Sequence, residues 1–337
     1  MMGLPSVSVI IPTYNRAGII AQTIDNIFEQ TYRNIEVIVV DDGSTDDTAA
    51  VLKSYGERVL WTVQKNSGPS AARNRGIAMA RGEIVAFQDS DDAWHPSKIE
   101  RQVSLLQRAG ESVPCCICNT DIYTAEGRVV DSFGNAGIDS PFEEGIWTNV
   151  ADVLATRFII FNQAATIRRS AVEKIGGFDE RLKCLEDHEM AIRLAYLGPW
   201  GFIRTRLVMQ KQGTANSISR HAIERPVLLA ENYVQKWKIV LERLPENGEG
   251  ARLRPVIGRR LKHAKRDLKI AKMIRGTSQA GRAIGYMASK VERLRAALGR
   301  RLPGYPQIQV QAVPPSSNVK FGSRMDEARS MQAPTFQ

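Results

Sequence analysis

The sequence has few of the features that mark membrane-spanning, secreted or disulfide-rich proteins. Its 337 residues include only four cysteines, too few for a disulfide scaffold. No apolar run approaches the roughly 18 to 20 residues that a membrane-spanning helix needs. The first residues, MMGLPSVSVIIP, lack the basic segment, apolar core and cleavage site of a signal peptide. The composition, 43% hydrophobic and 24% charged, can supply a full core. We expect a cytoplasmic protein.

Three of the four cysteines lie in one apolar segment, VPCCICNTDIY, which is typical of a buried strand. Cys115 and Cys118 form a CxxC pair, but a zinc site needs a second pair of ligands and none accompanies them. We therefore expect reduced cysteines in the core, with a redox or metal role as the alternative.

Two glycine-rich phosphate-binding motifs are also missing. No GxGxxG follows the first apolar strand pattern, and GxxxxGK[ST] does not occur. These absences disfavour a Rossmann dehydrogenase and a P-loop enzyme.

The positive charge is concentrated in one segment. The net charge is +10, but residues 251–302 hold sixteen Lys and Arg against two acids, Asp267 and Glu292. That segment therefore carries +14 and the rest of the chain −4.

The first hundred residues alternate between apolar strand patterns and amphipathic helix patterns. Strands are predicted over 7–11, 35–40, 59–63 and 84–87, and helices over 19–30, 45–55, 71–80 and from His95-Pro96 onward. Strands without polar alternation, separated by helices, indicate a parallel sheet covered on both faces. The predicted fold class is α/β, followed by a mixed region over 113–220 and a helical region from about 222.

Polar clusters follow three of these strands: PTYN, DDGSTDD and QDSDD. The ligand of an open α/β sheet binds outside the carboxyl ends of its strands, so the three clusters argue for one site. Asp89, Asp91 and Asp92 supply oxygen ligands for Mg²⁺ or Mn²⁺, which would hold a diphosphate. A solvated turn is the alternative for each cluster.

Two arginines, Arg73 and Arg75, lie near the start of the helix that follows the third strand. Guanidinium groups there can pair with phosphate or with the acidic cluster. An internal salt bridge is the alternative for each of them.

Four segments together resemble glycosyltransferase family 2, which has the GT-A (Rossmann-like) fold. They are SVIIPTYNR, VDDGSTDDT, NSGPSAARNRGIAMARGEIVAFQDSDD and GGFDERL followed by LEDHEMAIRLAYLG, in the order and spacing of the family. The resemblance covers residues 5–220 and implies an inverting enzyme. It leaves a helical basic extension at 222–302 and a tail at 303–337, which we expect to be disordered because it has few large apolar residues.

The resemblance also implies roles for individual residues. Pro12, Tyr14 and Asp42 would line the nucleoside pocket, with Arg73 near the nucleotide. Asp89 and Asp91 would form the DxD motif, with Asp92 beside them, and would coordinate the metal and the diphosphate. Asp187 would be the catalytic base, with Glu186 beside it as a substrate-binding residue.

The base assignment agrees with the local sequence. A sugar hydroxyl is a weak nucleophile and needs a carboxylate within hydrogen-bond reach. Glu186-Asp187 begins a predicted helix, whose dipole favours an anion at that end. Helix capping alone is the alternative.

The expected reaction is transfer from a nucleotide sugar, with a UDP-sugar favoured, to a saccharide or lipid-linked acceptor in cell-surface glycan synthesis. The QxxRW motif of processive family members does not occur here. We therefore expect one or a few sugars to be added. The segment QKQGTANSISRH resembles a loop that closes over the diphosphate, and Lys211 and His221 are its candidate phosphate-binding residues.

Amphipathic patterns recur over 253–275 and 280–302, each with a basic opposite face. They favour an anionic membrane surface as a partner of residues 251–302, which would place the protein on the inner face of the cytoplasmic membrane. Packing on the catalytic domain or an oligomer contact is the alternative. Nucleic acid is disfavoured, because Tyr286 is the segment's only aromatic residue.

Two other function classes stay open. A sugar-phosphate nucleotidyltransferase shares the sheet and the metal, but it normally has a glycine-rich basic loop that PTYNRAGI lacks. A non-catalytic saccharide-binding or scaffold protein is the other alternative.

Overall fold

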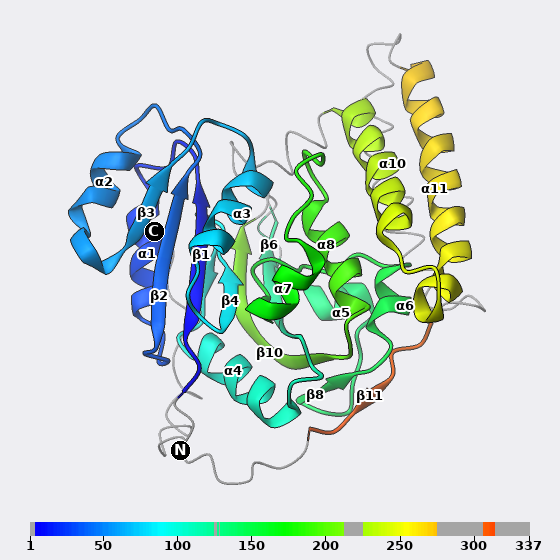
Figure 1. Cartoon of the computed structure of the whole chain (residues 1–337), viewed down its shortest axis with the longest axis horizontal. Coiled ribbons are helices and arrows are strands. Elements are labelled where there is room, and N and C mark those ends of the chain that lie inside the picture. The colour runs from blue at the N-terminus through cyan, green and yellow to red at the C-terminus, as the bar shows by residue number, and fades with distance from the viewer. Residues whose placement is uncertain (1–3, 125–126, 128, 212–224, 275–305, 314–337) are drawn as a thin grey trace.

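The computed structural model describes residues 4–124, 127, 129–211, 225–274 and 306–313 (Figure 1). Its first part alternates strands and helices, as the sequence predicts. The elements are β1 (Val7–Thr13), α1 (Ile20–Phe28), β2 (Ile35–Asp41), α2 (Thr48–Ser54), β3 (Leu60–Val63), α3 (Pro69–Met79) and β4 (Ile84–Phe87). Pro69 occupies the first turn of α3, where its missing N–H leaves no hydrogen bond unmade.

The middle of the chain is mixed. It comprises β5 (Ala93–Trp94), α4 (Lys98–Ala109), β6 (Cys115–Tyr123), β7 (Val129–Asp131), α5 (Ser132–Ala136), β8 (Glu144–Trp147), α6 (Val150–Leu154), β9 (Ala165–Arg168), α7 (Arg169–Ile175), α8 (Glu186–Ala195) and β10 (Trp200–Lys211). The described elements after it are α10 (Pro226–Arg243), α11 (Gly248–Ile274) and β11 (Val310–Gln311).

One sheet runs through the described part of the chain, in the order β11-β8-β10-β6-β9-β4-β1-β2-β3. The β1, β2, β3 and β4 strands pair in parallel, and so do β6 and β10. The β9 strand separates these two groups and is antiparallel to both β4 and β6. Off this path, β5 pairs antiparallel with β10 and β7 with β6. Seven of the eleven described strands therefore run in one direction and β5, β7, β8 and β9 oppose them, which confirms the predicted mostly parallel α/β sheet.

Helices cover both faces of this sheet, and successive residues of β1 enter different cores. Val9 and Ile11 belong to a buried cluster with residues of α1, α2 and α4. Ile10 belongs to the cluster on the other face, with residues of α3, α7 and α8. Alternation of side chains along a strand places the two apolar sets on opposite faces. The continuous apolar runs of the sequence reflect this double burial.

The helices α10 and α11 lie side by side, and α10 packs against α8 (Figure 1). Trp237 of α10 and Leu253 and Ile257 of α11 are buried in the same cluster as α8. The first amphipathic pattern, 253–275, thus uses its apolar face for packing. The second, 280–302, lies outside the described residues.

The expectation of a disordered tail is wrong for one described segment. Residues 310–311 form β11, which pairs antiparallel with β8, and Thr148 N donates to the Gln309 carbonyl at 2.9 Å. The β8 edge offers unpaired backbone groups that this short strand satisfies.

Two further observations concern the described residues. None of the helices there has the length and apolarity needed to cross a membrane. All four cysteines lie there too, and each is buried and free, which confirms the prediction of reduced core cysteines.

Candidate active site

Three polar motifs meet at one edge of the sheet because β1 lies between β2 and β4. Thr13, at the end of β1, is in register with Asp41, and its carbonyl accepts the N–H of Asp42 at 2.8 Å. On the other side, Gln88 N donates to the Ile10 carbonyl at 3.0 Å. PTYN, DDGST and QDSDD therefore follow adjacent strands, as the pattern indicates.

Asp42 is buried and organises the loop between β3 and α3. One carboxylate oxygen accepts from Gln64 Nε2 at 2.8 Å and from the backbone N–H of Ser67 at 2.9 Å, and the other accepts from Gly68 N at 2.8 Å. Near it, Pro12 is half-buried and Tyr14 is 46% exposed. These side chains outline the surface where the resemblance expects a nucleoside.

Arg73 joins the strand-end acids to the start of α8. Arg73 is 4% exposed, and its guanidinium donates to Asp89 Oδ1 and to Glu186 Oε1, each at 2.8 Å. Burial opposes the charged form, but the two carboxylates hold the pKa of Arg73 above its ordinary value. Residues separated by 113 positions thus form one charged cluster.

The carboxylates of the QDSDD turn differ in their surroundings. Asp89 also accepts from Gln163 Nε2, and Asp91 lies 3.6 Å from Arg16. Asp92 is buried and accepts from Lys211 N at 3.1 Å. Burial, with the negative charges of Asp89 and Asp91, raises the pKa of Asp92 well above its ordinary value.

The carboxylates of the QDSDD turn suit a divalent cation that takes most of its ligands from water and phosphate oxygens. The side chains of Asp89 and Asp91 are 29% and 19% exposed, so carboxylate oxygens of one turn stay open to solvent. Within the described residues, no group of three or more His, Cys, Asp or Glu side chains is arranged to hold a metal. Mg²⁺ is commonly bound through one or two carboxylates plus water and phosphate oxygens, which these residues can satisfy.

Glu186 and Asp187 occupy the first turn of α8, one residue after a strained position. Leu185, the N-cap, has φ 68°, in the left-handed region that a leucine rarely adopts. Such strain concentrates at functional sites and persists only where the surroundings hold it. Burial and the neighbouring charge of Glu186 raise the pKa of Asp187 to about 7. That carboxyl can therefore exchange a proton near neutral pH.

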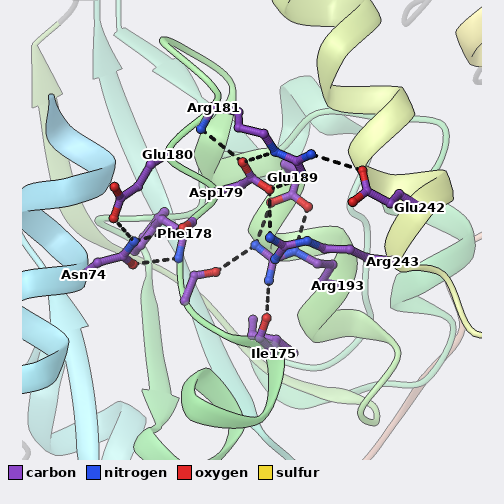
Figure 2. A network of polar contacts seen from close by, with 11 residues as sticks. Asn74, Ile175, Phe178, Asp179, Glu180, Arg181, Glu189, Arg193, Glu242 and Arg243 are labelled. Atoms are coloured by element: carbon purple, nitrogen blue, oxygen red, sulfur yellow. Dashed lines mark hydrogen bonds and ion pairs between the residues drawn. The ribbon is translucent and has the colours of Figure 1, made fainter. Parts of the chain in front are cut away.

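The GGFDERL segment locks α8 against α3 (Figure 2). Asn74 of α3 accepts from Phe178 N at 2.8 Å and donates to the Phe178 carbonyl at 2.9 Å. Gly177 has φ 65°, and a Cβ there would lie 2.6 Å from the Asn74 side-chain oxygen, so any other residue at this position would be strained. Arg193 donates to the buried Glu189 and to the Gly177 carbonyl, at 2.6 and 2.8 Å.

Some contacts at the site were not predicted. Gln163 and Arg16 reach the acids of the QDSDD turn from distant segments. No short motif marks Gln163, and Arg16 ends the segment SVIIPTYNR but had no predicted role there. Lys211, a candidate for phosphate binding, ends β10, and its backbone meets Asp92. His221 lies outside the described residues.

Residues 8–175 match the family model described as "Glycosyl transferase family 2". This part of the chain belongs to that family, and the resemblance to it is confirmed; the fourth motif, which begins at Gly176, lies beyond the matched residues.

Curated relatives are named glycosyltransferases. An uncharacterized glycosyltransferase of Rickettsia prowazekii is 32% identical over 187 residues, which cover 55% of this chain and 57% of the relative. A Bacillus subtilis glycosyltransferase named for teichuronic acid biosynthesis, TuaG, is 32% identical over 154 residues, covering 44% of this chain and 60% of TuaG. The chain thus spans little more than half the length of these relatives.

Solved structures show the same fold. TarS of S. aureus (residues 1–349), in complex with UDP-GlcNAc, has a TM-score of 0.58 at 19% identity, covering 89% of this chain and 82% of that one. A mannosyltransferase from Pyrobaculum calidifontis, in complex with GDP-Man and Mn²⁺, has a TM-score of 0.52 at 21% identity, covering 89% and 88%. At these identities the likeness concerns the fold alone.

Proposed function

We propose that the protein is an inverting, metal-dependent glycosyltransferase that uses a nucleotide sugar, with a UDP-sugar favoured. One observation carries this proposal: Arg73 bonds to Asp89 and to Glu186, at 2.8 Å each, and so joins the strand-end acids to the turn that holds Asp187. The complexes of TarS with UDP-GlcNAc and of the mannosyltransferase with GDP-Man support the same kind of donor.

The proposed reaction is a direct displacement. Asp187 accepts the proton of an acceptor hydroxyl while that oxygen bonds to the anomeric carbon of the donor sugar. The bond from this carbon to the diphosphate oxygen breaks, and the nucleoside diphosphate leaves with the bonding electron pair. The acceptor is a saccharide or a lipid-linked saccharide, and the product is part of a cell-surface glycan. The name of TuaG supports polysaccharide synthesis.

Asp89 and Asp91, with Asp92 beside them, are the proposed residues for Mn²⁺ or Mg²⁺. The metal would offset negative charge on the leaving diphosphate. Pro12, Tyr14 and Asp42 would contact the nucleoside, and Arg73 and Glu186 would face the donor from the α8 side.

Metal-dependent nucleotide binding is the first expected result. In calorimetric titrations with UDP, GDP and dTDP, we expect one nucleotide to bind with Mn²⁺ and to bind at least about tenfold more weakly with EDTA, because the metal bridges carboxylate and diphosphate. Asp91→Asn should abolish the difference between Mn²⁺ and EDTA. The matched control is Asp139→Asn, outside the site. Absence of binding by all three nucleotides would contradict the donor-site proposal.

The proposed organisation is a catalytic domain over 5–220 and a helical basic extension over 222–302 that meets the cytoplasmic face of the membrane. Exposed Lys265 and Lys269, with Ile270 and Met273 at 42% and 75% exposure, form the described part of that surface on α11. A cation near an anionic lipid surface contributes about 1 kcal/mol.

Binding to vesicles tests this surface. We expect co-sedimentation with vesicles of phosphatidylcholine and phosphatidylglycerol, and not with phosphatidylcholine alone. Lys265→Gln/Lys269→Gln should weaken it about tenfold or more, since two cations are lost. The charge-matched Lys53→Gln/Lys174→Gln, on α2 and α7, should not. Equal effects of the two pairs would show that net charge alone is responsible.

A further inference from the structure

One face of α10 contacts the segment that carries the proposed base. Asn232 is 6% exposed, and its side-chain oxygen accepts the backbone N–H of Lys183 at 2.9 Å and of Cys184 at 3.4 Å. Its amide nitrogen donates to the Leu228 carbonyl at 2.9 Å, which fixes the orientation of the side chain. The last N–H groups before Leu185 are therefore held from the neighbouring helix.

One helical turn further along, Lys236 contacts the residue that follows Asp187. Lys236 is 1% exposed, and its Nζ lies 3.1 Å from His188 Nδ1. The opposite ring nitrogen, Nε2, lies 3.0 Å from the Leu154 carbonyl. An ammonium group only donates hydrogen bonds, so Nδ1 of His188 is the acceptor. The ring proton is then on Nε2, which donates to the Leu154 carbonyl. The ring is thus fixed between α6 and α10.

The surroundings of Lys236 and His188 favour this arrangement. Lys236 Nζ lies 4.2 Å from the ring centre of Trp237 and 4.7 Å from that of Tyr233, so its charge faces two aromatic rings. Burial and the charge of Lys236, with a smaller effect of Arg260, hold the pKa of His188 well below its ordinary value. The imidazole is therefore neutral and can accept from Lys236.

The same helix holds the other end of the segment (Figure 2). Arg243 lies 2.9 Å from the buried carboxylate of Asp179, and Glu242 accepts from Arg181 at 3.1 Å. The α10 helix thus contacts the segment 179–188 at three places. They are Asp179 and Arg181, then Lys183 and Cys184 just before α8, and then His188 in the first turn of α8. Asn232 and Lys236 are the two contacts that bracket the strained Leu185 and the acids after it.

We propose that Asn232 and Lys236 are positioning residues for Asp187. They hold the backbone on both sides of the turn from Leu185 to Asp187, and so fix the direction in which the Asp187 carboxylate points. The inference rests on the proposed role of Asp187 as the base. It makes α10, beyond the part matched by the family model, a component of the catalytic centre.

Amide hydrogen exchange tests the positioning without a ligand. Asn232→Leu should raise exchange of the amides of residues 183–188 about tenfold or more, because the acceptor is lost. Asn232→Asp keeps an oxygen acceptor and should stay within about twofold of the wild type. Lys236→Met should likewise raise exchange there, and Lys238→Met, exposed on the same helix, should not. Exchange unchanged in Asn232→Leu overturns the proposal, even where Lys236→Met fails to fold.

Turnover tests the consequence. It is measured as release of nucleoside diphosphate from UDP-GlcNAc and from GDP-mannose with Mn²⁺. We expect kcat to fall about tenfold to a hundredfold in Asn232→Leu and Lys236→Met, with UDP or GDP affinity unchanged, and Asn232→Asp to recover it. A uniform loss of binding and kcat, or unchanged kcat, overturns the proposal. If Asp187→Asn keeps full turnover, the proposed base itself is wrong, which separates the two failures.

Discussion

Asp187→Asn is expected to lower kcat by about 10²- to 10⁴-fold, the usual contribution of a general base. Asparagine has the shape of aspartate and keeps a side-chain oxygen. That oxygen can accept the backbone N–H of His188, whose nitrogen now lies 2.7 Å from Asp187 Oδ1. The fold and the donor surface should therefore be preserved. What is lost is the capacity to take a proton from the acceptor hydroxyl.

Nucleotide binding and pH dependence make this result specific. Asp187→Asn should bind nucleoside diphosphate as tightly as the wild type, measured by calorimetry. The pKa of Asp187 is raised to about 7, so the carboxyl is neutral below that pH and ionised above it. The kcat/KM of the wild type should fall as the pH is lowered through about 7, and residual activity of the variant should lose this dependence. A variant that binds and turns over like the wild type would favour a non-catalytic binding protein.

Local sequence patterns predicted the half of the fold that positions the strand-end acids. The run from Val7 to Ile11 has no polar alternation beyond Ser8, and Pro69 and His95-Pro96 mark helix starts, so element type and order follow from short segments. Adjacent parallel strands end at one edge, which brings Asp42 near PTYN without any knowledge of tertiary contacts.

The contacts that complete the site depend on long-range packing. The contact of Arg73 with Glu186 depends on how β9 enters the sheet, antiparallel between β4 and β6, and the four residues ATIR do not reveal that direction. Gln163, in the loop before β9, reaches Asp89 for the same reason. The polar residues Asn232 and Lys236 on α10 break its apolar face, and this departure from amphipathic spacing is the only sequence signal that marks them.

The β11 strand illustrates a limit of composition. Residues 306–313 contain Pro, Gln and only three large apolar side chains, so low hydrophobicity indicated disorder. A strand of two residues needs no alternating hydrophobic pattern when the edge strand β8 supplies its hydrogen bonds. Side chains add to this: Asn149 Nδ2 donates to the Gln307 carbonyl at 2.6 Å, and Arg157 donates to the Pro306 carbonyl at 2.9 Å.

Arg193→Met is expected to lower the free energy of unfolding by about 3–5 kcal/mol, the usual effect of removing one partner of a buried ion pair. Glu189 is 0% exposed and would keep its charge without the two hydrogen bonds that Arg193 now donates at 2.6 Å each (Figure 2). The carbonyls of Ile175 and Gly177 would lose a donor as well. Urea denaturation measures the change.

Two further variants separate burial from charge. Arg266→Met removes an arginine paired with Asp267 where both side chains are about half exposed, so it should change the free energy of unfolding by about 1 kcal/mol or less. Glu189→Leu/Arg193→Met removes both buried charges and should be more stable than Arg193→Met alone, because no carboxylate is left without a partner. If Arg193→Met and Arg266→Met had equal effects, the buried pair would not be what fixes α8 to the GGFDERL segment. The placement of Asp187 would then depend on the contacts from α3 and α10 alone.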